Sequence, residues 1–174
     1  VVAVELDGGL IPLLEHTLAE FDNVRLIHGD ILSREPDEYM SSGETSATEN
    51  YKIVANIPYY ITSAILRHVL EASVKPKLLV VALQLEVARR IVALPGDMSV
   101  LAVSVQFYGR PQMVGCVPSG AFYPSPETDS AILRIDVFDQ PQVSVSDAGW
   151  FFQVVRAGFS QRRKQLQNSL ASGL

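Results

Sequence analysis

A short polar and aromatic motif, Asn56-Ile57-Pro58-Tyr59, offers the most specific chemistry in the sequence. It follows residues 51–55, an apolar run that predicts a buried strand. The Asn56 amide oxygen can accept a hydrogen bond from an exocyclic N–H of adenine. Pro58 favours extended backbone at Ile57, which can turn a main-chain carbonyl outward as a second acceptor. Tyr59 offers a flat ring on which a base can stack, a contact worth about 1–3 kcal/mol. Together these residues indicate a site for attack by the amino group of an adenine.

Two acidic residues, Glu5 and Asp30, close two of the predicted strands that precede this motif. A carboxylate at a strand end can accept both hydroxyls of a ribose, which is the role we expect for Glu5. Asp30 can accept a hydrogen bond from an adenine amino group, with Ile31 lying against the ring. A surface acid at Glu5 and a helix cap or turn at Asp30 are the alternative interpretations. The fold should bring Glu5, Asp30 and Asn56 to a single rim.

Predicted strands and helices alternate along the chain. Strands are predicted at residues 1–6, 24–27, 51–55, 78–84, 114–117 and 130–137, and helices at 10–21, 61–72, 86–93 and 150–159. Residues 33–50 and 118–126 are predicted to be loops, and a further helix is expected to begin near Ser160. Residues 99–108 are ambiguous, because their β-branched side chains favour a strand and their length allows a helix. This alternation predicts an α/β fold with an open, mostly parallel sheet.

Composition excludes several classes of protein. With 174 residues, 48% of them hydrophobic, the chain can bury the core of one domain. Cys116 is the only cysteine, which excludes an intramolecular disulfide and fits a reducing compartment. No apolar stretch reaches the roughly 20 residues that a membrane helix needs, so we expect a cytoplasmic protein without a membrane partner. The sequence has no heptad repeat that would indicate a dimer, so we expect a monomer. The spacing of His16, His28 and His68 suggests no metal site.

The charge is distributed unevenly. The formal net charge is −5, yet no acidic residue follows Asp147. Arg156, Arg162, Arg163 and Lys164 all lie in that last segment. A local cationic cluster can contact the phosphates of RNA although the whole chain is acidic. A solvated helix face is the alternative interpretation of the same residues.

Several motifs, taken in order, resemble those of the ribosomal RNA small-subunit adenine dimethyltransferase family. That family shares its catalytic fold with the adenine methyltransferases that confer macrolide resistance. The matching stretches are Val4-Glu5-Leu6-Asp7, His28-Gly29-Asp30-Ile31, Asn56-Ile57-Pro58-Tyr59-Tyr60-Ile61-Thr62, Leu83-Gln84-Leu85-Glu86-Val87-Ala88, Val117-Pro118, Ala121-Phe122-Tyr123-Pro124-Ser125-Pro126, Asp129-Ser130-Ala131, Phe159-Ser160-Gln161-Arg162-Arg163-Lys164 and Asn168-Ser169-Leu170. They cover nearly the whole chain, and residues 121–126 and 161–164 are the most diagnostic.

The resemblance implies a Rossmann-like methyltransferase fold with S-adenosylmethionine as the methyl donor. Glu5 would hold the ribose of the donor, and Asp30 would hold its adenine amino group with Ile31 against the ring. Asn56 would contribute to the donor site as well as to the acceptor site. By the same analogy residues 99–108 should form a helix.

On the acceptor side, the resemblance implies that Asn56 and the carbonyls of Ile57 and Pro58 hold the target amine. Tyr59 and Phe122 would sandwich the target base. A Phe between a glycine and two prolines sits on a loop, where a core role is less expected.

The implied activity is transfer of methyl groups to adenines of small-subunit ribosomal RNA, giving dimethyladenine during ribosome biogenesis. A catalytic domain is expected at 1–140 and the start of a helical RNA-binding domain at 147–174. The family's first strand and glycine-rich loop would precede Val1, so the fragment alone should bind the donor poorly. Alternatives are a large-subunit resistance enzyme, a DNA adenine methyltransferase, and a non-catalytic assembly or transcription factor. A dinucleotide oxidoreductase explains neither Asn56 nor Phe122.

Overall fold

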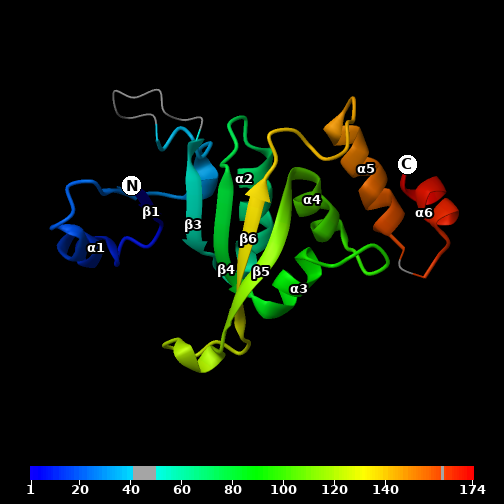
Figure 1. The fold of residues 1–174 in the computed structure, drawn as a ribbon. Coiled ribbons are helices and arrows are strands. Elements are labelled where there is room, and N and C mark those ends of the chain that lie inside the picture. The colour runs from blue at the N-terminus through cyan, green and yellow to red at the C-terminus, as the bar shows by residue number, and fades with distance from the viewer. Residues whose placement is uncertain (41–49, 162) are drawn as a thin grey trace. The chain divides into compact units, whose positions relative to one another are not determined.

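A computed structural model describes residues 1–40, 50–161 and 163–174. Figure 1 labels the helices and strands of these residues, which form two compact units. The first consists of Val1–Tyr51 with Ala64–Pro76, and the second of Lys52–Ser63 with Lys77–Leu174. Arg162 and residues 41–49 of the predicted 33–50 loop lie outside the described residues.

The first unit is built on a pair of parallel strands. β1 (Val2–Glu5) pairs with β2 (Arg25–His28), and Glu5 lies opposite His28 at the carboxyl ends. Between them in sequence lies α1 (Ile11–Leu18), and after β2 comes the short 3-10 helix η1 (Ile31–Ser33). Most of α2 (Thr62–Glu71) also belongs to this unit. These elements agree with the strands and helices expected from the sequence.

The second unit contains a four-stranded sheet with the order β3-β4-β6-β5. Its strands are β3 (Lys52–Asn56), β4 (Leu78–Gln84), β5 (Gly109–Val117) and β6 (Ser130–Val137). β3 and β4 are parallel, whereas β6 runs antiparallel to both of its neighbours. β5 therefore runs in the direction of β4, and β6 alone of these four strands is reversed. The predicted α/β class with a mostly parallel sheet is confirmed.

Alternate residues of the two central strands form the core of this unit. Leu79, Val81 and Leu83 on β4 and Leu133 and Ile135 on β6 are fully buried. The short helix α3 (Leu85–Ile91) contacts β4, β5 and β6, and α4 (Val100–Tyr108) contacts β5. This period-two burial is the pattern that a sheet with one well-covered face imposes on its sequence.

The ambiguous segment 99–108 is a helix, as the family resemblance implies. Ser99 caps α4, its hydroxyl accepting a hydrogen bond from the Ala102 N–H at 3.3 Å. The Gln106 amide donates to the Ile91 carbonyl at 2.8 Å, which ties α4 to the end of α3. Capping and this long-range bond outweigh the preference of β-branched residues for strands.

The predicted start of β5 is wrong. The sequence places the strand at 114–117, whereas it begins five residues earlier, at Gly109. Pro111 and Gly115 interrupt the strand pattern in the sequence, but β5 lies at the edge of the sheet, where a missing N–H is tolerated. A shift of register between Met113 and Gly115 marks a bulge that accommodates the irregularity.

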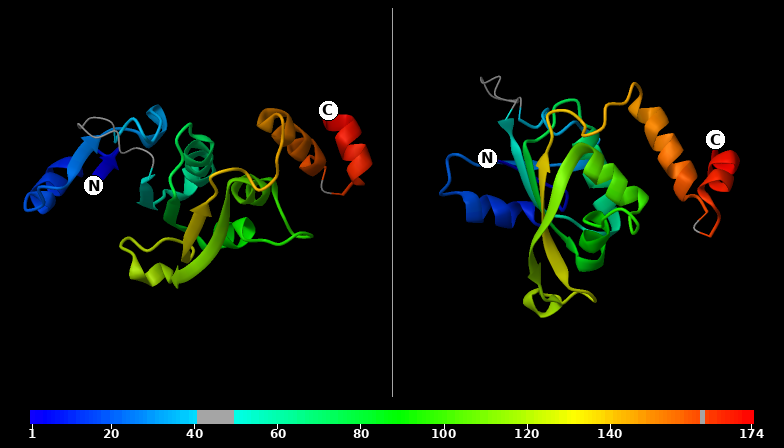
Figure 2. Two further views of the ribbon diagram at one scale, coloured as in Figure 1. Left: turned by 45° about the horizontal axis from the view of Figure 1, so that its top comes forward. Right: turned by 45° about the vertical axis from the view of Figure 1, so that its right-hand side comes forward.

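Two helices close the chain. α5 (Ala148–Phe159) confirms the predicted helix, and its Phe151 ring stacks on Phe107 of α4 with ring centroids 4.8 Å apart. The second helix, α6 (Leu166–Gly173), begins six residues later than predicted. Ser160 is the C-cap of α5, and its hydroxyl donates to the Ala157 carbonyl at 2.7 Å. Figure 2 shows α5 and α6 side by side. No helix in the described part of the chain is long and apolar enough to cross a membrane.

Candidate functional site

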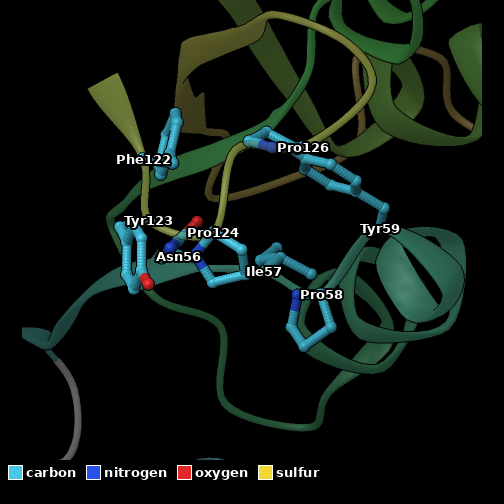
Figure 3. Close-up of a pocket in the computed structure, with 8 residues that line it drawn as sticks. All are labelled: Asn56, Ile57, Pro58, Tyr59, Phe122, Tyr123, Pro124 and Pro126. Carbon is cyan, nitrogen blue, oxygen red and sulfur yellow. The ribbon is translucent and has the colours of Figure 1, made fainter. Parts of the chain in front are cut away.

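A cavity of about 290 Å³ lies in the second unit at the carboxyl end of β3. Its lining comes from two segments that are far apart in sequence, shown together in Figure 3. They are Asn56, Ile57, Pro58 and Tyr59, and Phe122, Tyr123, Pro124 and Pro126. The structure thus brings every acceptor-side residue expected from the sequence to one pocket.

Asn56 is the last residue of β3 and lies opposite Ala82 of β4. Pairing continues one residue further, because the Ile57 N–H donates to the Ala82 carbonyl at 3.0 Å. The Ile57 side chain is 2% exposed and anchors the motif, whereas Asn56 is exposed at the pocket. A buried residue directly after Asn56 therefore fixes the backbone from which the amide projects.

The Pro58 carbonyl is already used within the protein. It accepts hydrogen bonds from the Ile61 N–H at 3.2 Å and from the Thr62 hydroxyl at 3.4 Å. These bonds start the 3-10 helix η3 (Tyr59–Ile61), which leads into α2. Of the two main-chain acceptors expected from the sequence, Ile57 is consequently better placed than Pro58 to bind a ligand.

The two aromatic rings expected to hold a base are both half-buried and both line the cavity. The Tyr59 hydroxyl lies 2.7 Å from the Ser130 hydroxyl of β6. Phe122 follows the 3-10 helix η4 (Ser119–Ala121), on a loop as the sequence predicted. Tyr123, which was not among the expected site residues, also lines the cavity and is fully exposed. In the sequence, its position next to Phe122 was the feature that could have indicated a place in the pocket.

Glu5 and Asp30 lie in the first unit, at the ends of two paired strands. The Gly29 N–H donates to the Glu5 carbonyl at 2.9 Å, which continues the pairing of β1 with β2. One Glu5 carboxylate oxygen accepts from the Asp7 N–H at 2.7 Å. One Asp30 oxygen accepts from the Leu32 N–H at 2.9 Å. Among the described residues, the second oxygen of each carboxylate has no hydrogen-bond partner.

Tyr39 is a structural partner of Asp30 that sequence reasoning missed. Its side chain is buried, and its hydroxyl donates to the Asp30 carbonyl at 2.6 Å. The Ser33 hydroxyl donates to the same carbonyl at 2.7 Å, and the Arg25 guanidinium donates to the Tyr39 carbonyl. The described part of the 33–50 loop thus fixes the backbone of Asp30. An aromatic residue within an otherwise polar loop was the signal for this role.

The cationic residues near the C-terminus do not share one helix. Arg156 lies near the end of α5, whereas Arg163 and Lys164 lie in the connection between α5 and α6. All three are exposed. Arg162 lies outside the described residues. The exposed cations can contact a polyanion, although no helix face organises them.

Two of the three histidines, His28 and His68, contact backbone carbonyls. The His28 Nε2 lies 3.2 Å from the Leu6 carbonyl, and the His68 Nε2 lies 2.9 Å from the Arg34 carbonyl. Within the described residues no group of three or more His, Cys, Asp or Glu side chains could hold a metal ion.

Comparison with known proteins decides the family. Residues 1–174 match the family model described as ribosomal RNA adenine dimethylase. The chain belongs to that family. Two bacterial relatives, both named ribosomal RNA small subunit methyltransferase A, are 50% identical over 177 residues (Dehalococcoides mccartyi, strain CBDB1) and 45% identical over 178 residues (Moorella thermoacetica). They match 100% and 99% of this chain, which spans 58% and 62% of their own lengths.

Two solved structures have a fold similar to that of this chain. The structure of the 23S rRNA methyltransferase ErmE superposes with a TM-score of 0.77 at 28% identity, covering 99% of this chain and 66% of that one. A dimethyladenosine transferase from Plasmodium falciparum superposes with a TM-score of 0.79 at 21% identity, covering 97% and 58%. The Rossmann-like methyltransferase fold expected from the resemblance is confirmed.

Proposed function

We propose that this dimethylase-family chain is the main part of an enzyme that transfers methyl groups from S-adenosylmethionine to the exocyclic amine of adenines in small-subunit ribosomal RNA. The product would be dimethyladenine, formed during ribosome biogenesis. The observation that carries the proposal is the pocket in which the exposed Asn56 amide lies with the rings of Tyr59 and Phe122. The names of the bacterial relatives support the small subunit as the source of the RNA.

The acceptor amine is held by Asn56 and Ile57 in this proposal. Its lone pair is delocalised into the adenine ring, so the amine is a poor nucleophile. Hydrogen bonds from its two N–H groups to the Asn56 amide oxygen and the Ile57 carbonyl favour a pyramidal nitrogen. The same bonds stabilise the positive charge that develops on nitrogen during attack. The Pro58 carbonyl, already bonded to Ile61, supports the turn that presents these two acceptors.

The target base is held between aromatic rings. A base in a stacked strand must leave its stack to reach the pocket, which costs a few kcal/mol and less in single-stranded RNA. Stacking on Tyr59 and Phe122 offsets that cost, because each base–aromatic contact is worth about 1–3 kcal/mol. The pocket also contains three prolines, which suit a flat, largely apolar ligand.

The donor-side residues fit the group that the family implies. Glu5 and Asp30 each keep one carboxylate oxygen on local backbone, so each side chain is oriented before a ligand arrives. The remaining oxygens match the hydroxyl and amino donors of an adenosine moiety. Ile31 would lie against its ring, and Asn56 is the further donor-side residue that the family implies. S-adenosylmethionine, when bound, supplies an already activated methyl group. The protein therefore needs to align the amine rather than to provide an acid or a base.

The RNA contacts that we propose lie at the C-terminus. Arg156, Arg163 and Lys164, together with Arg162, would neutralise phosphates around the target. This assigns 1–140 to the catalytic domain and 147–174 to the start of a helical RNA-binding domain. The partner would be the small ribosomal subunit, bound by a monomeric enzyme in the cytoplasm.

The test is methyl transfer to defined substrates. The protein in its natural full length would be incubated with radiolabelled S-adenosylmethionine and with small or large ribosomal subunits that lack dimethyladenine. Label recovered as dimethyladenine from small-subunit RNA is the expected result. Label in large-subunit RNA alone would move the assignment to the resistance-type enzymes. Tight subunit binding without any transfer would indicate an assembly factor.

A further inference from the structure

Two adjacent residues at the start of β6, Asp129 and Ser130, contact both halves of the base pocket. Ser130 is paired with Gln84 at the end of β4 and with Val117 at the end of β5. Its side chain is 1% exposed, and its hydroxyl lies 2.7 Å from the Tyr59 hydroxyl. One hydroxyl donates to the other, across 71 residues of sequence. This bond connects the first pocket segment to β6.

Asp129 connects the second pocket segment, which contains Phe122, to the start of β6. One of its carboxylate oxygens accepts from the Ser119 N–H of η4 at 2.9 Å. The Ser119 carbonyl in turn accepts from the Phe122 N–H at 3.2 Å and from the Ser125 hydroxyl at 3.0 Å. The backbone N–H of Phe122 and the side chain of Ser125 are therefore both hydrogen-bonded to Ser119, which is itself held by Asp129.

The strand itself does not need these side chains. The backbone of β6 is paired on both sides, and the Asp129 carbonyl accepts from the Leu85 N–H at 3.0 Å. A fully buried strand position is ordinarily apolar, and a buried hydroxyl without a partner costs free energy. Ser130 thus places a polar side chain where an apolar one is usual, and its hydroxyl hydrogen-bonds to Tyr59. A serine at this position is explained if the orientation of the Tyr59 ring matters for the function of the pocket.

We propose that Asp129 and Ser130 are positioning residues that fix the two aromatic faces of the base pocket, Phe122 through Ser119 and Tyr59 through its hydroxyl. The proposal rests on the proposed function. The terminal ring torsion of a tyrosine has a broad minimum, so packing alone leaves its tilt loosely defined. A hydrogen bond at the far end of the ring restricts that tilt. Transfer requires the amine to be held in a near-attack geometry, so loss of the restriction lowers the rate.

The first test is a double-mutant cycle. Tyr59→Phe and Ser130→Ala each remove the bond, and Tyr59→Phe keeps the stacking ring. Each variant of the full-length protein is expected to lower kcat for methyl transfer about tenfold, the effect of losing one buried hydrogen bond. The double variant should be no slower than the slower single variant, because both changes remove the same interaction. The affinity for S-adenosylmethionine should not change.

A matched control separates positioning from general stability. Ser104→Ala removes a hydroxyl that donates to the Val100 carbonyl within α4 at 2.8 Å, away from the pocket lining. It should leave kcat unchanged. On the second segment, Asp129→Ala should lower kcat, whereas Asp129→Asn keeps an oxygen for the Ser119 N–H and should restore most of it. Thermal melts of all variants identify any that fail to fold.

A second readout does not depend on transfer. A single-stranded RNA with 2-aminopurine in place of the target adenine reports stacking in the pocket through quenching of its fluorescence. Quenching by the wild type that is lost in Ser130→Ala and Asp129→Ala, and retained in Ser104→Ala, supports the proposal. The wild type could transfer methyl groups and quench the fluorescence while Ser130→Ala does both equally well. That result would overturn this inference and leave the methyltransferase assignment intact. Additive losses in the double variant would also overturn it. A wild type that neither transfers methyl groups nor quenches would contradict both proposals.

Discussion

The Asp30 carboxylate accepts a hydrogen bond from the backbone N–H of Leu32 at 2.9 Å. The residue therefore caps η1, which was the structural interpretation of Asp30 left open by the sequence. Capping uses one carboxylate oxygen and leaves the other without a hydrogen-bond partner among the described residues. Capping of η1 and the proposed bond to the adenine amino group of the methyl donor are compatible, and substitution can separate them.

Asp30→Asn should separate the two roles. An asparagine whose amide oxygen caps Leu32 presents an NH₂ group in the other direction, which cannot accept from a donor's amino group. We expect normal stability with binding of S-adenosylmethionine weakened about tenfold or more, measured by calorimetry on the full-length protein. Asp30→Ala should lose both binding and about 1 kcal/mol of stability. Equal affinity of Asp30→Asn and the wild type would argue against Asp30 as a donor ligand.

Two glycines of β5 give a prediction about stability. A Cβ at Gly109 would lie 2.7 Å from Ile135 Cγ2 and 2.9 Å from the Asp136 carbonyl oxygen. Gly109→Ala should therefore cost about 1–3 kcal/mol, because backbone in the neighbouring strand has to move. Gly115→Ala is the matched control on the same strand, since its Cβ meets nothing closer than 4.0 Å and should change stability by about 0.5 kcal/mol or less. Urea unfolding midpoints of the two variants provide the comparison.

Tyr51 predicts how stability depends on alkaline pH. Burial, and then the nearby charges of Asp37 and Glu35, raise the pKa of the Tyr51 phenol above its ordinary value. A group whose pKa is raised by folding contributes stability that is fully present below its unfolded pKa, near 10, and is lost as the pH rises beyond it. The wild type should therefore lose stability as the pH rises from about 9 to 11 and beyond.

Tyr51→Phe tests that origin. It removes the hydrogen bond from the Tyr51 hydroxyl to the Val74 carbonyl, so it should cost about 1 kcal/mol at neutral pH. The loss of stability between neutral and alkaline pH should nevertheless be smaller in the variant, measured by denaturant unfolding at each pH. An unchanged alkaline loss would place its origin elsewhere in the protein.

The cationic residues make a prediction about salt. If Arg163 and Lys164 contact phosphates, the variant with both changed to alanine should bind RNA more weakly. The plot of log affinity against log salt concentration should become shallower, its slope losing about 0.7–0.9 in magnitude for each phosphate that is no longer neutralised. Arg67→Ala is the control, because Arg67 is an exposed cation in an ion pair with Glu71 in the first unit. A slope that is the same in the double variant and the wild type would exclude phosphate contacts by these two residues.

The local parts of the site could be predicted from the sequence. Asn56 and Glu5 are strand-end residues next to apolar runs, and those runs form β3 and β1 almost where they were expected. Phe122 lies on a loop because prolines and a glycine surround it. In each case the controlling information is within a few residues of the site.

The errors occur where distant residues decide the structure. β5 begins at Gly109, which pairs with Val137 of β6, a partner that lies outside any local pattern. The engagement of the Pro58 carbonyl depends on the start of η3, and the bond between Tyr59 and Ser130 joins positions 71 residues apart. Tyr39 was missed for the same reason, since only the folded loop carries it to Asp30.

In the proposed function, Asn56 holds an adenine amine for methyl transfer. The most direct measurement compares the full-length wild type with Asn56→Ala in transfer of radiolabelled methyl groups to small ribosomal subunits that lack dimethyladenine. Asn23→Ala changes a different asparagine, one that belongs to the first unit, and serves as the control. We predict that Asn56→Ala lowers kcat by a factor of about 100 or more, and that Asn23→Ala has the activity of the wild type. Wild-type activity in Asn56→Ala would show that Asn56 does not hold the target amine.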